Sequence, residues 1–243
     1  MVVAVEGEGE GEDDAVRCES IKVLIRIRPL VALELESEDR SHESVVEAKP
    51  TEVVLHGREA RHQLRCGFDT VLGQGCNQED VYAQVGDCVD RVARGFNATI
   101  LAYGQTGSGK THTMFGGAGW SEHEEGWASG GIIPRCVAAL FEVLPKDATV
   151  FASFVQIYRE QVFDMLRDGA RSSALEIHQE EDGDGTFVAG LSEYAARSAR
   201  DCVDLIRAGE ENCAVLESIT SRPAWDIFKP LYLAQIELDF HDS

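Results

Sequence analysis

A chain of 243 residues, of which 44% are hydrophobic, is long enough for one sizeable α/β domain with a buried core. Its net charge of −21 argues against nucleic acid or an anionic membrane as a partner of the whole surface, because such a surface repels phosphates. The sequence shows no long apolar span and no signal peptide, so we expect a protein of the cytoplasm.

The N-terminal part of the chain is strongly acidic. Residues 6–14 are an unbroken mixture of Glu, Asp and Gly, which cannot bury itself against a core. We therefore predict a disordered acidic tail over residues 1–19, with the main domain starting at residue 20.

The first predicted strand of the domain covers residues 21–28, alternates at its end and stops at a proline. Ile25 and Ile27 alternate with Arg26 and Arg28, so apolar and charged side chains fall on opposite faces, and Pro29 ends the run. Residues 34–47 are charged and predict an excursion over the surface.

Two further short strands and a helix are predicted before the next buried strand. Residues 52–56 and 61–66 are expected to pair as a peripheral hairpin. Asn77 is the predicted N-cap of a helix that runs to about Arg94 and closes at Gly95, because apolar residues recur at three- and four-residue spacing.

The most informative segment follows a short apolar run at residues 98–103, which predicts a buried strand. The next eight residues have the pattern Gly-x4-Gly-Lys-Thr of the Walker A phosphate-binding loop. Glycines let several backbone N–H groups approach an anionic triphosphate, and Lys110 would bring a positive charge to the β- and γ-phosphates. The Thr111 hydroxyl would be one ligand of Mg²⁺. The predicted nucleotide-binding residues are Gly104, Gln105, Thr106, Gly107, Ser108, Gly109, Lys110 and Thr111.

The remaining predicted elements follow in chain order. They are an exposed glycine-rich loop beside the nucleotide site (116–131), a helix (132–144), a central strand buried on both faces (149–157), a hairpin (176–178 with 186–188), a helix that opens at Ser198 and that Gly209 ends, and a terminal strand within residues 231–240. Asp239 could be a Walker B carboxylate, although the run that carries it is half polar.

Seven cysteines are scattered along the chain without a Cys-x2-Cys pair, which predicts reduced thiols. A zinc site assembled from Cys66, Cys76 and either His56 or His62 is an alternative that the spacing permits.

Several of these separated motifs, taken in order, resemble the kinesin motor domain. They lie at residues 25–29, 68–69, 77–82, 95–114, 131–135 and 153–166. The resemblance implies a three-layer P-loop NTPase fold of the α/β class, with a mixed central sheet flanked by helices, over residues 20–222. It also implies ATP and Mg²⁺ as cofactors, microtubules (tubulin) as partner, and a cytoskeletal location.

The resemblance implies roles for residues outside the loop as well. Arg26, Arg28, Pro29 and His112 fall where kinesins enclose the adenine and ribose. A flat ring and a rigid proline edge are reasonable neighbours for a base. The alternative for the two arginines alone is a solvated strand face.

The chain departs from the kinesin pattern after Ser218. Kinesins place Asn-x-x-Ser-Ser-Arg-Ser-His there, whereas this sequence has Thr-Ser-Arg-Pro, so Ser221 and Arg222 are candidate remnants of the first nucleotide switch. Nothing resembles the second switch, Asp-Leu-Ala-Gly-Ser-Glu. We therefore expect a partial motor domain, incomplete at its C-terminus, followed by a divergent segment over residues 223–243.

Two functions follow from this sequence. The first is a kinesin-type motor that moves on microtubules through ATP hydrolysis. The second is a non-motile nucleotide-binding or interaction protein built on a partial kinesin motor domain. In kinesins the groups that position water and sense the γ-phosphate come from the two switches, so the catalytic residues of this chain stay unknown. A small-molecule kinase has only the phosphate loop in its favour.

Overall fold

The computed structural model describes residues 2–7, 21–31, 34, 45–57, 63–117, 129–145, 148–167, 173–180, 185–219 and 231–239. The chain divides into two compact units, Met1–Val143 and Leu144–Ser243, and each combines strands with helices. No helix in these ranges is long and apolar enough to cross a membrane.

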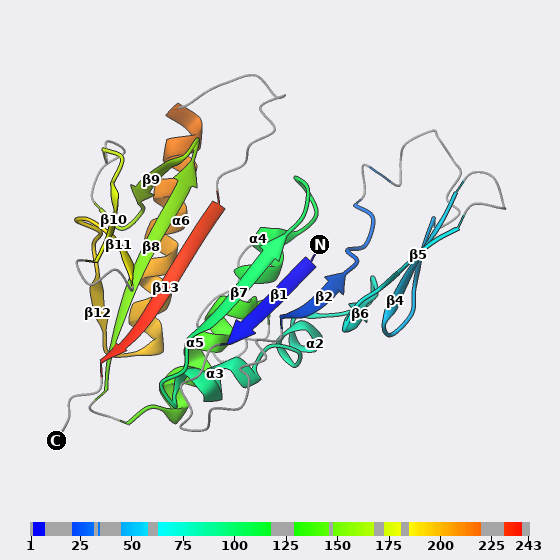
Figure 1. The fold of residues 1–243 in the computed structure, drawn as a ribbon, viewed down its shortest axis with the longest axis horizontal. Helices are drawn as coiled ribbons and strands as arrows, with labels where there is room; N and C mark the ends of the chain where they lie inside the picture. Colours follow the sequence, from blue (N-terminus) through cyan, green and yellow to red (C-terminus); the bar gives the residue numbers. More distant parts are fainter. Residues whose placement is uncertain are drawn as a thin grey trace. The chain divides into compact units, whose positions relative to one another are not determined.

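The first unit is built on a mixed four-stranded sheet with the order β6-β2-β1-β7. The strands are β1 (Val2–Gly7), β2 (Lys22–Arg26), β6 (Thr70–Leu72) and β7 (Ala98–Tyr103). Strands β2 and β6 run parallel, whereas β1 is antiparallel to both β2 and β7 (Figure 1). The predicted strands at residues 21–28 and 98–103 are therefore present, the first of them as Lys22–Arg26.

Strand β1 corrects the expectation for the N-terminus. The prediction of disorder over residues 1–19 is wrong for Val2–Gly7. This strand pairs along its whole length with β7, and its residues from Val2 to Val5 pair with β2. Valines at three of its first four positions favour a strand, and β2 and β7 satisfy its backbone groups on both sides. Residues 8–20, with most of the acidic run, lie outside the described residues.

Among the described residues of the first unit, helices are formed by α2 (Gln78–Tyr82), α3 (Asp87–Val92), α4 (Lys110–Met114) and α5 (Ile132–Val143). Asn77 caps α2 through a capping box with Asp80, as predicted for a helix start. The helix expected to run to Arg94 is instead two short helices, with a turn between them that places Gly86 against the Tyr82 ring.

The helices cover one face of β7. Helices α3 and α4 contact this strand, and a core of Leu24, Val81, Val85 and Ile132 lies nearby in the same unit. On the other face of β7, Leu101 is 40% exposed and Tyr103 is 70% exposed. Among the described residues, helices thus cover one face of β7.

A small antiparallel sheet completes the first unit. Its strands β3 (Val46–Ala48), β4 (Glu52–His56) and β5 (Gln63–Gly67) follow one another in chain order. Strands β4 and β5 confirm the predicted peripheral hairpin.

The second unit is centred on β8 (Thr149–Tyr158), which is buried along most of its length, as predicted. It pairs antiparallel with β9 (Gln161–Asp164), β12 (Tyr194–Ala196) and β13 (Leu231–Asp239). Helix α6 (Ala199–Ile219) packs on β8, and the predicted hairpin is present as β10 (Ile177–Gln179) and β11 (Thr186–Val188).

Gly209 has a different role from the one expected. It was predicted to end a helix, but α6 continues ten residues beyond it to Ile219. A Cβ at Gly209 would overlap the ring of Phe154 in β8. Glycine is therefore needed for the close approach of helix and sheet. The predicted helix start is confirmed, because the Ser198 hydroxyl accepts a hydrogen bond from the Asp201 backbone N–H.

Candidate functional site

The candidate site lies where β7 ends and α4 begins, which confirms the strand–loop–helix order that the motif requires. In the loop, Gly107 has φ +78° and Gly109 has φ +94°, and nothing lies within 4 Å of a Cβ built on either. The Ser108 N–H donates to the Gln105 carbonyl at 3.1 Å, which closes a turn. Both glycines therefore adopt left-handed conformations that other residues rarely take.

The side chain of Lys110 folds back onto the loop that precedes it. Its Nζ donates to the Gly104 carbonyl at 2.6 Å and to the Gln105 carbonyl at 3.1 Å. Ser108 Oγ is buried and lacks a hydrogen-bond partner among the described residues. A phosphate group would satisfy such a buried hydroxyl and offer Lys110 a stronger, charged acceptor. The residues of the loop thus fit an anionic ligand.

Thr111 is exposed at the second position of α4, so its hydroxyl is accessible to a cation. Mg²⁺ is commonly held by one or two protein oxygens together with substrate phosphates, so a single hydroxyl is a sufficient protein contribution. In the described ranges no group of three His, Cys, Asp or Glu side chains could hold a metal. His56 of the alternative zinc site contacts Glu47 and Gln63, and His62 lies outside the described residues.

Arg28 ties the phosphate loop to the segment that follows β2. Its Nε donates to the Gly107 carbonyl at 2.7 Å, and its two terminal nitrogens donate to the Glu34 carboxylate at 2.6 and 2.8 Å. Glu34 also accepts the Val31 backbone N–H at 2.9 Å. The hydrogen bond from Arg28 is the main cause that lowers the pKa of Glu34 to about 2. The same pair raises the pKa of Arg28, so this bridge stays fully charged at neutral pH.

Arg26 lies apart from the loop surface. Its side chain is only 8% exposed, and one terminal nitrogen donates to Gln78 Oε1 at 2.9 Å and to Thr113 Oγ1 at 2.8 Å. Gln78 in turn donates to the His112 carbonyl at 2.5 Å. This arrangement fixes α4 against α2 and β2. It favours a supporting role for Arg26 over direct contact with a base.

The other two residues expected around the adenine and ribose are at the surface. Pro29 is exposed, and its carbonyl accepts a hydrogen bond from Arg28 at 2.9 Å. The ring of His112 lies beside Gly117. Partial burial and then the charge of Arg26 lower the pKa of His112, so its ring is neutral at physiological pH. An exposed neutral ring and a proline edge are suitable for contact with a planar base.

Several predicted features lie outside the described residues. Ser221 and Arg222, the candidate remnants of the first switch, are among them, as are residues 118–128 of the expected surface loop. The two ends of that loop do meet, because Gly116 and Gly130 form a β-bridge. Asp239 lies opposite Thr149 on β13, which pairs with β8 and not with β7. This placement gives no support to a Walker B role for Asp239.

The sequence did not predict three residues as part of the site: Glu34, Gln78 and Thr113. Glu34 was assigned to a charged surface segment, and Gln78 is an ordinary first residue of a capped helix. Their partners lie 6 to 87 residues away in the chain, so no local pattern marks them.

Comparison with known proteins identifies the family. The Kinesin motor domain family matches residues 26–222. Kinesin-like protein KIF7 of Mus musculus is 33% identical over 194 residues, which is 78% of this chain and 14% of that protein. The kinesin heavy chain of Syncephalastrum racemosum is 34% identical over 202 residues, which is 81% of this chain and 20% of that protein.

A solved structure is similar as well. It is described as "Structure of a fast kinesin: Implications for ATPase mechanism and interactions with microtubules", and it aligns with a TM-score of 0.75 at 27% identity. The alignment covers 88% of this chain and 58% of the solved chain. The chain thus spans little more than half of that structure and a fifth or less of the two relatives. A family match over most of its length shows that this α/β chain belongs to the kinesin motor domain family.

Proposed function

We propose that the chain binds ATP with Mg²⁺ at residues 104–111, as the nucleotide site of a kinesin-type motor. The observation that carries this proposal is the loop itself: left-handed Gly107 and Gly109, the buried unpartnered Ser108 hydroxyl, and Lys110 folded over the loop carbonyls. A triphosphate would be held by backbone N–H groups and by the Lys110 ammonium. Bound Mg²⁺ supplies neutralisation of phosphate charge, with Thr111 as its protein ligand.

The residues around the loop have distinct roles in this proposal. Arg28 donates to the Gly107 carbonyl and so restrains the loop, while Arg26 restrains α4 through Thr113. Pro29 and His112 would contact the base. Arg26 is a positioning residue, since its guanidinium is buried away from the surface.

The motor activity is proposed from the family. A kinesin that binds ATP moves on microtubules by hydrolysing it, which implies tubulin as partner and a place on the cytoskeleton in the cytoplasm. The competing function is a non-motile nucleotide-binding or interaction protein built on the same partial motor domain. ATP turnover with and without microtubules separates the two. A stimulated rate supports the motor, and unstimulated turnover with ATP still bound supports the alternative.

The nucleotide site is tested by Lys110→Ala, with Lys49→Ala as matched control. Lys49 lies between β3 and β4 of the small peripheral sheet and pairs with Glu52 at 3.0 Å. Titration with a fluorescent ATP analogue should show an affinity loss of about 100-fold or more for the Lys110 variant, because it removes a charge-assisted contact to phosphate. The control should bind like the parent chain. Unaltered affinity in Lys110→Ala would overturn the site.

A further inference from the structure

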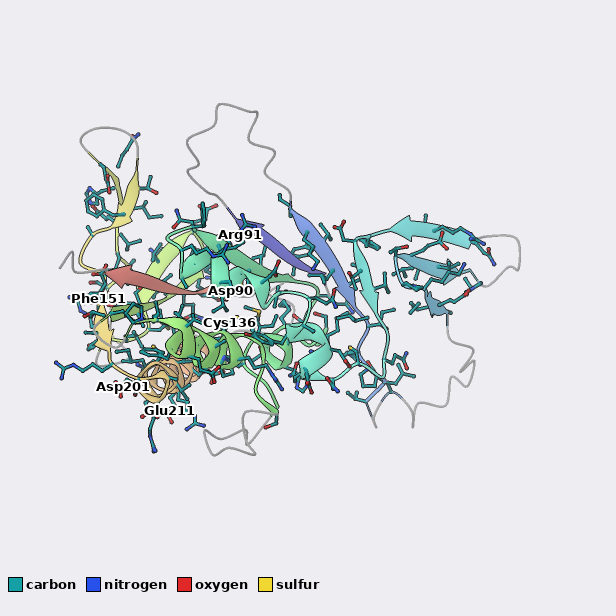
Figure 2. The ribbon with its side chains drawn as sticks, turned by 90° about the horizontal axis from the view of Figure 1, so that it is seen from below. Asp90, Arg91, Cys136, Phe151, Asp201 and Glu211 are labelled. Atoms are coloured by element: carbon teal, nitrogen blue, oxygen red, sulfur yellow. The ribbon has the colours of Figure 1, made fainter. Side chains whose placement is uncertain are left out.

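Strand β1 lies between the two strands that lead into the candidate site. The sheet order is β6-β2-β1-β7, so among the described residues β1 is the only strand that pairs with β7. Its first residue, Val2, lies opposite Ile25 of β2 and opposite Tyr103 of β7. Helix α3, of which Figure 2 labels Asp90 and Arg91, contacts both β1 and β7. Within the sheet, β7 is therefore attached to β2 through β1.

The strands on either side of β1 end at the same edge of the sheet. Because β1 is antiparallel to both, β2 and β7 run in the same direction. The last residue of β7, Tyr103, directly precedes Gly104 of the loop, and Arg28 follows the end of β2 by two residues. Ligands of open α/β sheets bind at such an edge, outside the carboxyl ends of the strands. Val2, at the start of β1, lies at this same edge.

Arg28 connects β2 to the loop across the width of β1. Two strand spacings separate β2 from β7, which is about 9–10 Å. The Nε atom of Arg28 nevertheless donates to the Gly107 carbonyl at 2.7 Å. Hydrogen bonds of this kind are confined to about 2.7–3.2 Å, so a change in the distance or register of β7 relative to β2 would break this one. The gap that Arg28 spans is therefore set by β1.

We propose that Val2–Gly7 is a positioning strand of the nucleotide site: it holds β7 at the distance from β2 at which Arg28 restrains the phosphate loop, and ATP binding depends on it. This inference rests on the proposed ATP site. It adds a segment outside the residues that match the kinesin family, 26–222. When β1 detaches, β2 and β7 lose the backbone hydrogen bonds that fix their distance and register. The hydrogen bond from Arg28 to Gly107 is then lost, and the loop samples conformations that do not hold phosphate.

The coupling between β1 and the loop has to act in both directions. If attachment of β1 favours the loop conformation that binds ATP, bound ATP stabilises the attached strand by the same free energy. Backbone amides that pair within a sheet exchange with solvent when their segment opens locally. Bound nucleotide should therefore slow hydrogen exchange in β1 as well as in the loop.

The first test is hydrogen–deuterium exchange of the full chain, with and without Mg²⁺ and a non-hydrolysable ATP analogue, followed by mass spectrometry of peptides. We expect exchange to slow about 10-fold in the peptides that cover Val2–Gly7 and residues 104–111, and to stay unchanged in β5 of the peripheral sheet. Slowing in the loop without slowing in β1, or equal slowing in β5, would overturn the positioning role. No slowing in the loop would contradict the proposed ATP site itself.

The variant Val3→Pro disrupts β1 directly. Proline removes the backbone N–H of residue 3, which a strand with neighbours on both sides uses for pairing. Leu64→Pro is the matched control, because it places the same residue in β5 of the peripheral sheet. In titrations with a fluorescent ATP analogue, we expect at least about 10-fold weaker binding for Val3→Pro and parental affinity for Leu64→Pro. Parental affinity for Val3→Pro, or an equal loss in the control, would overturn the proposal.

Arg28→Ala distinguishes positioning from a general loss of stability. In the parent chain it removes the restraint on Gly107 and should weaken ATP binding by about 5-fold or more. In the Val3→Pro chain it should change the affinity by less than about 2-fold, because the restraint is already absent. Equal losses in the two chains would overturn the role of β1. The exchange measurement needs no variant, so it still decides the question if Val3→Pro does not fold.

Discussion

Replacement of Gly209 by alanine tests how tightly α6 packs on β8. The added Cβ would lie 2.6 Å from Cε1 and 3.2 Å from Cγ of Phe154, and closer still to Cδ1. Phe154 is 2% exposed, so its ring has no room to leave. Ordinary contacts between carbon atoms are about 3.5–4.0 Å, so the helix or the ring must move by about 1 Å or more.

Two opposing effects set the size of the change. In the interior of a helix, alanine is more favourable than glycine by roughly 1 kcal/mol. Overpacking of a filled core costs about 1–3 kcal/mol, and this site lies at the upper end because the obstacle is a rigid ring. We therefore expect Gly209→Ala to lower the free energy of unfolding by about 2 kcal/mol.

The measurement is urea unfolding followed by the helical circular dichroism signal. Ala208→Gly is the matched control, because Ala208 is exposed on the same helix and loses only helix propensity, about 1 kcal/mol. In the double variant with Phe154→Leu, the loss of unfolding free energy should be about 1 kcal/mol smaller than the sum of the losses in the two single variants. The reason is that the smaller side chain makes room for the added Cβ. A Gly209→Ala chain as stable as its parent would refute the close packing.

Two further predictions concern the supports of the phosphate loop. Arg26→Met should lower the free energy of unfolding by about 3 kcal/mol, because it leaves two buried polar partners unsatisfied; a loss under about 0.5 kcal/mol in urea unfolding would contradict this role. The pKa of Glu34 in the folded chain, about 2, lies below its ordinary value of 4.5. Its bridge to Arg28 therefore contributes fully to the stability of the fold above about pH 4.5, and this contribution is lost as pH falls towards 2. The gap in melting temperature between the parent and Glu34→Gln should therefore shrink over that interval, and a carboxyl titration with a midpoint above 4 would rule out the bridge.

The phosphate loop was predictable because its information is local. Its eight consecutive residues carry the glycines that need positive φ, and the apolar run before them forms the strand that the motif needs. The supports of the loop were not predictable in the same way. Arg26 bonds residues 52 and 87 positions away, and the pairing depends on how β2, α2 and α4 meet.

Tertiary context also explains two of the corrected elements. The glutamates and glycines that follow residue 5 predict disorder, yet Val2–Gly7 finds hydrogen-bond partners in β2 and β7, which lie about 20 and 100 residues further along the chain. Gly209 satisfies the local rule for a helix end, but the position demands glycine because Phe154 approaches from another element. In both cases a distant partner outweighs the local preference.

The described contacts that shape the loop come from residues of the first unit. Arg28, which is bridged to Glu34, donates to the Gly107 carbonyl, and Arg26 donates to Thr113 of α4. The candidate switch remnants come instead from the stretch that follows α6 in the second unit. In the proposed function, phosphate binding and the response to bound phosphate would depend on different parts of the chain. Under the proposed function, we expect substitutions in the second unit that leave it folded to alter ATP turnover or its coupling to microtubules and to leave ATP affinity unchanged. Lys110→Ala should remove both ATP binding and ATP turnover.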